Sequence, residues 1–201
     1  MAGGRQTLTF AALAHRVRSD IGQAHRYAHS VRVARLADRL AQRHGGDPAR
    51  ARMAGMLHDV ARLWDPASLI AECEAREMPI DAFERRHPIV LHARLGAEIA
   101  RERYGIDDPA IHSAIARHTV AATDMSRLDT IVYLADALEP GRRYVEREAL
   151  EALAFVDLKA TLRAVLRSSF AELERRGQEP APQSLLALAA LERAERSPLP
   201  A

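Results

Sequence analysis

Apolar residues recur along this chain with the spacing of amphipathic helices. Between residues 157 and 176 they fall at three- and four-residue intervals, which places them on one helix face: Leu158, Leu162, Val165, Leu166, Phe170 and Leu173. Strand-like alternation is nearly absent from the rest of the sequence. The pattern predicts helices over residues 10–18, 23–44, 48–63, 66–76, 88–104, 109–118, 127–138, 157–176 and 185–193.

Residues that start or stop helices support these boundaries. Three Asp-Pro pairs place an N-cap before a proline at the first helical position, at residues 47–48, 65–66 and 108–109. No internal repeat or change of composition marks a second domain. We therefore predict an all-α protein with one helical bundle and a short C-terminal helical extension, which we expect to pack on its own domain. The expected divisions are a tail over residues 1–9, the bundle over 10–176, and a C-terminal helix and tail over 177–201.

Composition narrows the class of protein and its compartment. The 201 residues are 48% hydrophobic and 28% charged, an ordinary globular balance, and aromatic residues make up only 4%. Cys73 is the single cysteine, which excludes an internal disulfide and favours a reducing compartment. The sequence has no apolar run long enough for a membrane span and no apolar segment typical of a secretion signal near its start. We expect a cytoplasmic protein with no membrane partner.

The charge pattern gives little sign of nucleic-acid binding. Formal net charge is +2, and Lys159 is the sole lysine, so nearly all basic residues are arginine. Arginine can bind phosphate with two parallel hydrogen bonds. A near-neutral total, however, lacks the strong positive charge of most nucleic-acid-binding domains, so we expect no nucleic-acid partner.

Four of the nine histidines lie on apolar helix faces. His29 shares its predicted face with Val33, Leu36 and Leu40, which follow at helical spacing. Apolar residues also surround three histidines on other predicted helices, His58, His92 and His118. A single histidine of this kind is more often a hydrogen-bonded core residue than a metal ligand. Four of them on separate helices favour a shared site.

Two acidic residues accompany these histidines. Asp59 directly follows His58, and Asp136 lies one helical turn after Val132. A buried carboxylate is costly unless it is compensated, and a divalent cation binds carboxylates and neutral imidazoles together. These ligand types suit zinc, manganese or ferrous iron better than calcium. Six candidates exceed the needs of one tetrahedral site, and an aspartate can offer one oxygen to each of two ions. This favours a two-metal site suited to phosphoryl transfer.

The candidates lie within a series of short motifs. The motifs are Arg26–Val31 (RYAHSV), Ala54–Ala61 (AGMLHDVA), Leu91–Ala93, Gly96–Ala97, Ala114–Thr119 (AIARHT), Met125–Asp129 (MSRLD) and Tyr133–Pro140 (YLADALEP). With the histidine, His-Asp doublet and distal aspartate in this order, the chain resembles the HD superfamily of metal-dependent phosphohydrolases. Within that superfamily it resembles the bacterial YqeK-type proteins. The motifs span about residues 22–165, most of the chain.

The resemblance implies an HD phosphohydrolase domain over residues 10–176 and a specific reaction. That reaction is symmetrical hydrolysis of diadenosine tetraphosphate to two ADP, with a small-molecule dinucleoside polyphosphate as the partner. Iron is the implied cofactor, with manganese or zinc as alternatives, and the protein would be a monomer or a homodimer. The implied metal ligands, which include the catalytic doublet His58-Asp59, are His29, His58, Asp59 and Asp136 for one ion and Asp59, His92 and His118 for a second.

Further residues are candidates for contact with the substrate. The family usually has lysine shortly after the doublet, where this chain has Arg62, which keeps the charge with a different geometry. Arg26 and Arg142 match positions implied in phosphate contact, although each could equally be a solvated surface charge. Thr119 could bind a phosphate or cap the end of its helix. His87 could donate a proton to the departing nucleotide.

Two other functions stay open. The first is another HD-type reaction, carried out by a nucleotide phosphatase or by a phosphodiesterase acting on guanosine tetraphosphate or a cyclic dinucleotide. The absence of a Gly-Tyr-Pro motif after the histidines makes the cyclic substrate less favoured. The second is a non-catalytic, arginine-rich helical module that senses nucleotides or contacts RNA. The buried histidine and aspartate set argues against that module.

Overall fold

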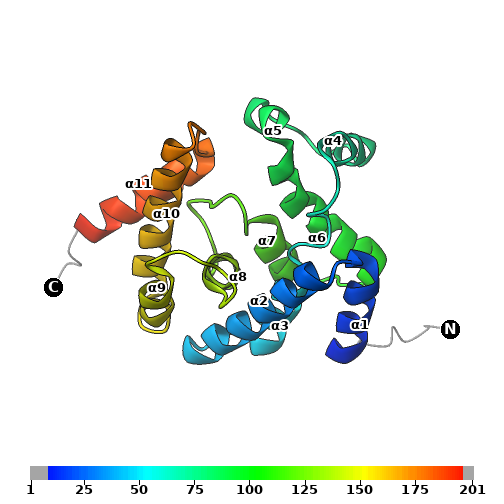
Figure 1. The fold of residues 1–201 in the computed structure, drawn as a ribbon, viewed down its shortest axis with the longest axis horizontal. Helices are drawn as coiled ribbons and strands as arrows, with labels where there is room; N and C mark the ends of the chain where they lie inside the picture. Colours follow the sequence, from blue (N-terminus) through cyan, green and yellow to red (C-terminus); the bar gives the residue numbers. More distant parts are fainter. Residues whose placement is uncertain (1–8, 197–201) are drawn as a thin grey trace.

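The computed structural model describes residues 9–196, and within that range it contains helices and no strands (Figure 1). The prediction of an all-α protein is confirmed. Its eleven α-helices and one 3₁₀-helix are α1 (Phe10–Ile21), α2 (Ala24–Arg43), α3 (Pro48–Leu57), α4 (Pro66–Ala75), α5 (Ala82–Arg86), η1 (Pro88–Val90), α6 (Leu91–Tyr104), α7 (Pro109–Ala116), α8 (Arg127–Leu138), α9 (Arg147–Ala154), α10 (Leu158–Arg175) and α11 (Pro182–Arg196).

The Asp-Pro pairs start helices as the sequence predicts. In each case the aspartate side chain accepts hydrogen bonds from two backbone N–H groups of the first turn, at Asp47, Asp65 and Asp108. The proline that follows lacks an N–H that the first turn would leave unpaired in any case. Ser126 starts α8 with a capping box, in which Asp129 returns a bond to the backbone N–H of Ser126.

Two helices were absent from the sequence prediction. Helix α5 has only five residues, but its capping box between Asp81 and Glu84 is a signal that could have revealed it. Helix α9 is rich in Ala, Leu and Glu, which are strong helix formers. Its N-cap residue, Glu146, makes no side-chain capping bond, so the sequence has no start signal at that point.

The third predicted helix is shorter than expected. We predicted that it would continue to residue 63, but α3 ends at Leu57. Bonds from Val60 to Leu57 and from Arg62 to Asp59 span three residues and replace the four-residue helical pattern. The His58-Asp59 doublet therefore lies in a tight turn, which changes the directions of its side chains from those of a regular helix. Similarly, residues 88–90 form η1 before α6 begins.

The core is built from small and aliphatic side chains in two clusters that share α2, α3 and α8. Alanine at many core positions lets these helices approach closely. The tightest approach is at Gly55 of α3, where a Cβ would lie 2.9 Å from the Cα of Ala34 on α2. The shared helices α2 and α8 carry two of the candidate ligands, and the doublet directly follows α3.

Helix α11 packs on the rest of the protein. Ala187 is buried in the second core cluster, and Leu188 and Leu191 pack against it, as the sequence predicted. Leu185 and Leu186 are exposed. The division at residues 176 and 177 stays a prediction, and residues 1–8 and 197–201 of the expected tails lie outside the described part of the chain. Among residues 9–196, no helix combines the length and apolar character needed to cross a membrane.

Candidate metal centre

The structure brings all six candidate ligands together. His29 comes from α2, the doublet from the turn after α3, and His92 from α6, while the other two lie just after α7 and on α8: His118 and Asp136. The four histidines and Asp59 are buried, and 20% of the Asp136 side chain is exposed. Helices far apart in the sequence thus direct polar groups to one place inside an apolar core.

One set of donor atoms gathers around a single oxygen of Asp59. The Nε2 atoms of His29 and His58 lie 3.1 Å apart, and each is 3.6 Å from Asp59 Oδ2. Asp136 Oδ1 completes the set at 3.1 Å from His29 Nε2 and 3.7 Å from His58 Nε2. Ligands that lie ~2.1 Å from one ion in a tetrahedral shell are about 3.4 Å from each other. These distances fit such a shell.

A second set faces the other oxygen of the same aspartate. Asp59 Oδ1 lies 3.2 Å from His92 Nε2 and 3.7 Å from His118 Nε2. The two imidazole nitrogens are 3.1 Å apart. Asp59 therefore offers one oxygen to each set.

The other ring nitrogen of each histidine is already hydrogen-bonded. Nδ1 of three rings donates to a backbone carbonyl: His58 to Gly55 and His118 to Ile115, both at 2.7 Å, and His92 to Ile89. A carbonyl only accepts, so the proton of each neutral ring is on Nδ1 and the Nε2 lone pair faces the site. Paired lone pairs 3.1 Å apart repel each other unless a cation lies between them. The donor arrangement therefore fits a bound divalent ion.

Glu139 orients His29, a role that the sequence did not predict, since Glu139 entered only as one member of the motif Tyr133–Pro140. Its side chain is almost fully buried, and Oε1 lies 3.1 Å from His29 Nδ1. The following Pro140 favours extended backbone, which ends α8 and turns this carboxylate away from the helix. Burial would raise the pKa of Glu139, but bonds from Arg32 and the Gly141 backbone lower it to about 2. The carboxylate of Glu139 is therefore ionised and can accept a hydrogen bond from the protonated Nδ1 of His29.

The same surroundings keep His58 and Asp59 in metal-binding protonation states. Burial lowers the pKa of His58 to about 4, although Asp59 and Asp136 oppose this. Burial would raise the pKa of Asp59, but His58, His118 and His92 hold it well below its usual range. At neutral pH the site thus presents an unprotonated imidazole next to an ionised carboxylate, as metal binding requires.

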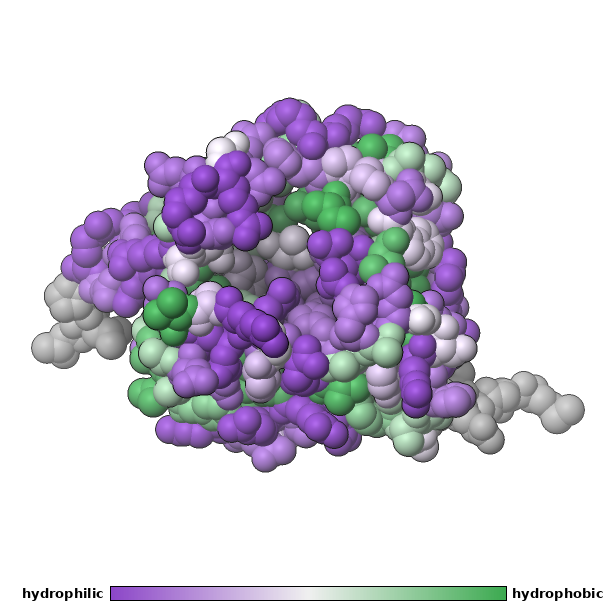
Figure 2. Space-filling model, in the orientation of Figure 1, coloured by the Kyte–Doolittle hydropathy of each residue, from purple (hydrophilic) through white to green (hydrophobic). Residues whose placement is uncertain are grey.

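A cavity of about 1050 Å³ opens onto these residues. Figure 2 shows it as a hollow between α10 and α11 on one side and α5 and α6 on the other. Arg26, Arg62 and Arg142 line it, as does Arg143, which the sequence analysis did not select. Arg62 and Arg143 form no ion pair with any residue in 9–196. Unpaired guanidinium groups beside a metal set suit an anionic phosphate chain.

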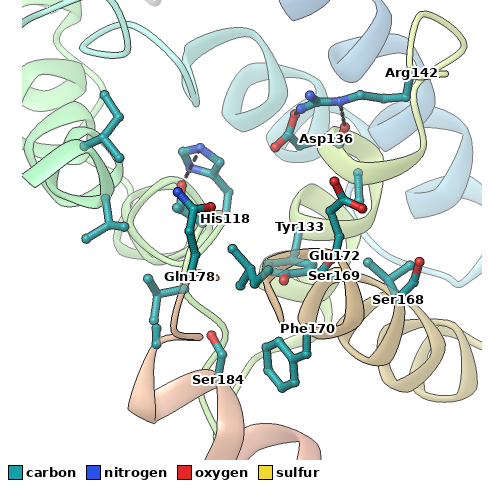
Figure 3. A pocket seen from close by; sticks show the side chains of 18 of the residues that line it. His118, Tyr133, Asp136, Arg142, Ser168, Ser169, Phe170, Glu172, Gln178 and Ser184 are labelled. Atoms are coloured by element: carbon teal, nitrogen blue, oxygen red, sulfur yellow. Dashed lines mark hydrogen bonds and ion pairs between the residues drawn. The ribbon is translucent and has the colours of Figure 1, made fainter. Parts of the chain in front are cut away.

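The other predicted substrate residues also line the cavity. Arg26 Nη1 lies 3.5 Å from Asp59 Oδ2, and Arg142 pairs with Asp136 (Figure 3). The Thr119 hydroxyl is 3.0 Å from His118 Nε2, so its side chain lies at the metal set. Tyr133 was missed by the sequence analysis. Burial, with a contribution from Asp136, raises its pKa well above the usual range of a tyrosine, so it lines the cavity as a protonated phenol.

His87 lies in the cavity wall and is engaged by another residue. Its Nε2 is 3.1 Å from Glu179 Oε1, and the same oxygen accepts bonds from Arg86. Its ring centroid is 4.6 Å from that of Phe83. No ligand-range contact joins His87 to the six clustered residues, so it has a role separate from theirs.

The comparisons with known proteins agree with this geometry. A family model described as the HD domain matches residues 26–141, which run from α2 to just beyond α8. This chain belongs to the HD family. The match contains all six clustered residues and excludes α9, α10 and α11. The HD region of this protein therefore supplies the candidate ligands, and one side of the cavity comes from the chain that follows.

Two relatives of this HD protein carry the same name. It is 32% identical to a symmetrical bis(5'-nucleosyl)-tetraphosphatase of Bacillus subtilis over 81% of this chain and 87% of that protein. It is 31% identical to a protein of the same name from Halalkalibacterium halodurans, over 80% and 86% of the two chains. A crystal structure of a predicted HD superfamily hydrolase involved in NAD metabolism, from Clostridium acetobutylicum, matches with a TM-score of 0.89 and 28% identity, covering 94% of this chain and all of that one.

Proposed function

We propose that this HD protein hydrolyses diadenosine tetraphosphate symmetrically, so that the dinucleotide and one water give two ADP molecules. The observation that carries the proposal is the cavity floor, where Asp59 joins two histidine sets beside unpaired arginines. Two relatives named for this type of reaction, each similar over about four fifths of this chain, add support. A paired metal site and a positive cavity are the features that hydrolysis of a polyphosphate requires.

We assign the two sets to two divalent ions. Asp59 would be shared, and the remaining ligands would be His29, His58 and Asp136 for one ion and His92 and His118 for the other. Iron is our proposed metal, and the nitrogen and oxygen donors are compatible with it. Elemental analysis of protein purified without added metal should find mainly iron. Manganese or zinc as the main metal would contradict this assignment and leave the ligand proposal in place.

The residues around the ions would bind and orient the substrate. Divalent ions in such a pair lower the pKa of water and neutralise charge on phosphate oxygens. Arg62 and Arg26 would bind phosphate oxygens, with Thr119 as a hydroxyl donor and Arg142 next to the Asp136 ligand. We retain His87 as the proton donor to the departing ADP. This role requires its bond to Glu179 to open, because Nε2 is the engaged atom.

A nucleotide panel tests the reaction. Purified protein is supplied separately with diadenosine tetraphosphate, guanosine tetraphosphate, a cyclic dinucleotide and ATP, and the products are separated by chromatography. We expect the dinucleotide to give ADP alone, with one ¹⁸O atom per two ADP when the reaction runs in ¹⁸O-labelled water. A mixture of ATP and AMP would contradict symmetrical cleavage. Preferred hydrolysis of guanosine tetraphosphate or the cyclic dinucleotide would show a different HD reaction.

Substitution of Asp59 tests the metal assignment. Asp59→Ala removes an oxygen from both sets, so we expect loss of bound metal together with loss of turnover, by at least about 100-fold. Metal content and rate are measured on the same preparation. The matched control is Asp124→Ala, because Asp124 is 72% exposed and does not line the cavity. Full activity at normal metal content in Asp59→Ala would overturn the assignment.

A further inference from the structure

The cavity extends well beyond the metal set. Residues of α10, of the turn to α11 and of α11 also line it, including Phe170, Gln178 and Ser184 (Figure 3) and Leu173. All of these follow the region matched by the HD family model. At about 1050 Å³, the volume is at the upper end of pockets that enclose drug-sized ligands. The space is larger than a phosphate chain on the ions needs.

The turn after α10 has a fixed backbone. Gly177 has φ +64°, a left-handed conformation that glycine adopts without strain. The Gly177 N–H donates to Glu174 and the Gln178 N–H donates to Leu173, which together form a Schellman motif. The position of the Gln178 Cα relative to α10 is therefore set by the backbone.

Glu179, the next residue of the turn, forms hydrogen bonds with the opposite wall of the cavity. Glu179 Oε1 accepts bonds from two nitrogens of Arg86, at 3.0 and 2.7 Å, and lies 3.1 Å from His87. Arg86 ends α5 and His87 directly follows it, so these bonds join the α10–α11 turn to the opposite wall. The backbone N–H of Gln178 thus belongs to the Schellman motif, and the next residue, Glu179, makes the bonds to the opposite wall.

The Gln178 side chain is directed into the cavity and has no hydrogen-bond partner among residues 9–196. Figure 3 shows its amide extending from the turn into the same space that His118 borders. A primary amide has two N–H donors and a carbonyl acceptor, and all are free here. Phe170 supplies an aromatic side chain to the wall of the same cavity. A primary amide that offers both a donor and an acceptor is complementary to the edge of an adenine base, and an aromatic side chain can pack against the face of a base.

We propose that Gln178 binds an adenine base of the substrate in this cavity, on the side formed by the α10–α11 turn, and so helps to determine which nucleotides are cleaved. Its N–H would donate to N7 of adenine and its carbonyl would accept from the N6 amino group, the pairing that glutamine makes with adenine edges elsewhere. This inference rests on the proposed function, because it assigns one end of the proposed substrate. It makes Gln178 a specificity-determining residue supplied by the chain outside the HD match.

The test compares substitutions at Gln178 in the full-length, metal-loaded protein. For Gln178→Ala we expect kcat/KM for diadenosine tetraphosphate to fall about 10- to 100-fold, with most of the change in KM. Gln178→Glu should lose at least as much, because a carboxylate cannot donate to N7. The matched control is Gln183→Ala, a substitution of another exposed glutamine, on α11, that does not line the cavity. We expect it to retain the activity of the unsubstituted protein.

Binding measurements separate this inference from the proposed function. Calorimetry with ADP and with inorganic diphosphate compares a phosphate ligand that has a base with one that does not. Gln178→Ala should weaken ADP binding about tenfold and leave diphosphate binding unchanged. Unchanged ADP affinity and KM in Gln178→Ala, or equal weakening of both ligands, would overturn the role of Gln178. If the unsubstituted protein cleaves no dinucleotide but shows Gln178-dependent ADP binding, the proposed function fails and the base contact stands.

Discussion

At the scale of single residues, the site depends on how each side chain is held as well as on its chemical type. Asp59 can serve two metal sets because its two oxygens face different histidine pairs. His29 depends on Glu139, which is 110 positions away in the sequence. A histidine held at Nδ1 keeps Nε2 directed at the ion without loss of side-chain entropy on binding.

Substitution of Glu139 should therefore weaken metal binding without removing a ligand. We expect Glu139→Gln to reduce metal affinity by about 10- to 100-fold, the range found when such supporting carboxylates are changed. Metal titration of the chelator-treated protein measures the effect. Glu148→Gln is the matched control, because Glu148 is 89% exposed. Equal affinities in the two variants would show that Glu139 does not support the site.

At the scale of helices, close packing positions the ligands. Helix α2 carries His29, and α3 ends one residue before the His58-Asp59 doublet, so the distance between these two helices fixes the first set. Gly55 allows the approach, because any Cβ there would meet the backbone of α2. The motif containing Gly55 was recognised in the sequence, but its packing role is visible only when α2 lies against it.

Gly55→Ala should therefore destabilise the protein. The added Cβ would lie 2.9 Å from the Cα and 3.0 Å from the backbone nitrogen of Ala34, and neither atom can move without shifting α2. We expect a loss of about 1–3 kcal/mol in the free energy of unfolding, measured by chemical denaturation. Gly46→Ala is the matched control, because its nearest contact would be an ordinary 3.5 Å. Equal stability of the two variants would contradict the packing argument.

At the scale of the whole molecule, the metal set joins segments that are distant in the sequence. The six side chains come from α2, α6 and α8 and from the segments that follow α3 and α7, so bound ions would link both core clusters. A ligand that binds only the folded state stabilises it in proportion to the logarithm of its concentration over its dissociation constant.

Metal removal should lower the melting temperature. At a free metal concentration about 100 times the dissociation constant, binding adds about 2.7 kcal/mol of stability, which a chelator removes. Thermal unfolding with and without chelator measures the change. Asp59→Ala should show a much smaller response, because it lacks the shared ligand. An identical chelator response in both proteins would mean that the stabilising metal binds elsewhere.

The sequence by itself determined the helical class and most helix boundaries, because capping residues and apolar spacing act over a few positions. It also revealed the six candidate ligands, since polar residues on apolar faces and the surrounding motifs are local features. Only the tertiary structure decided that the doublet lies in a turn, that the Asp59 oxygens face separate sets, and that Glu139 supports His29. It also decided that Gln178 faces the cavity. These arrangements depend on contacts between segments far apart in the chain, which no local pattern specifies.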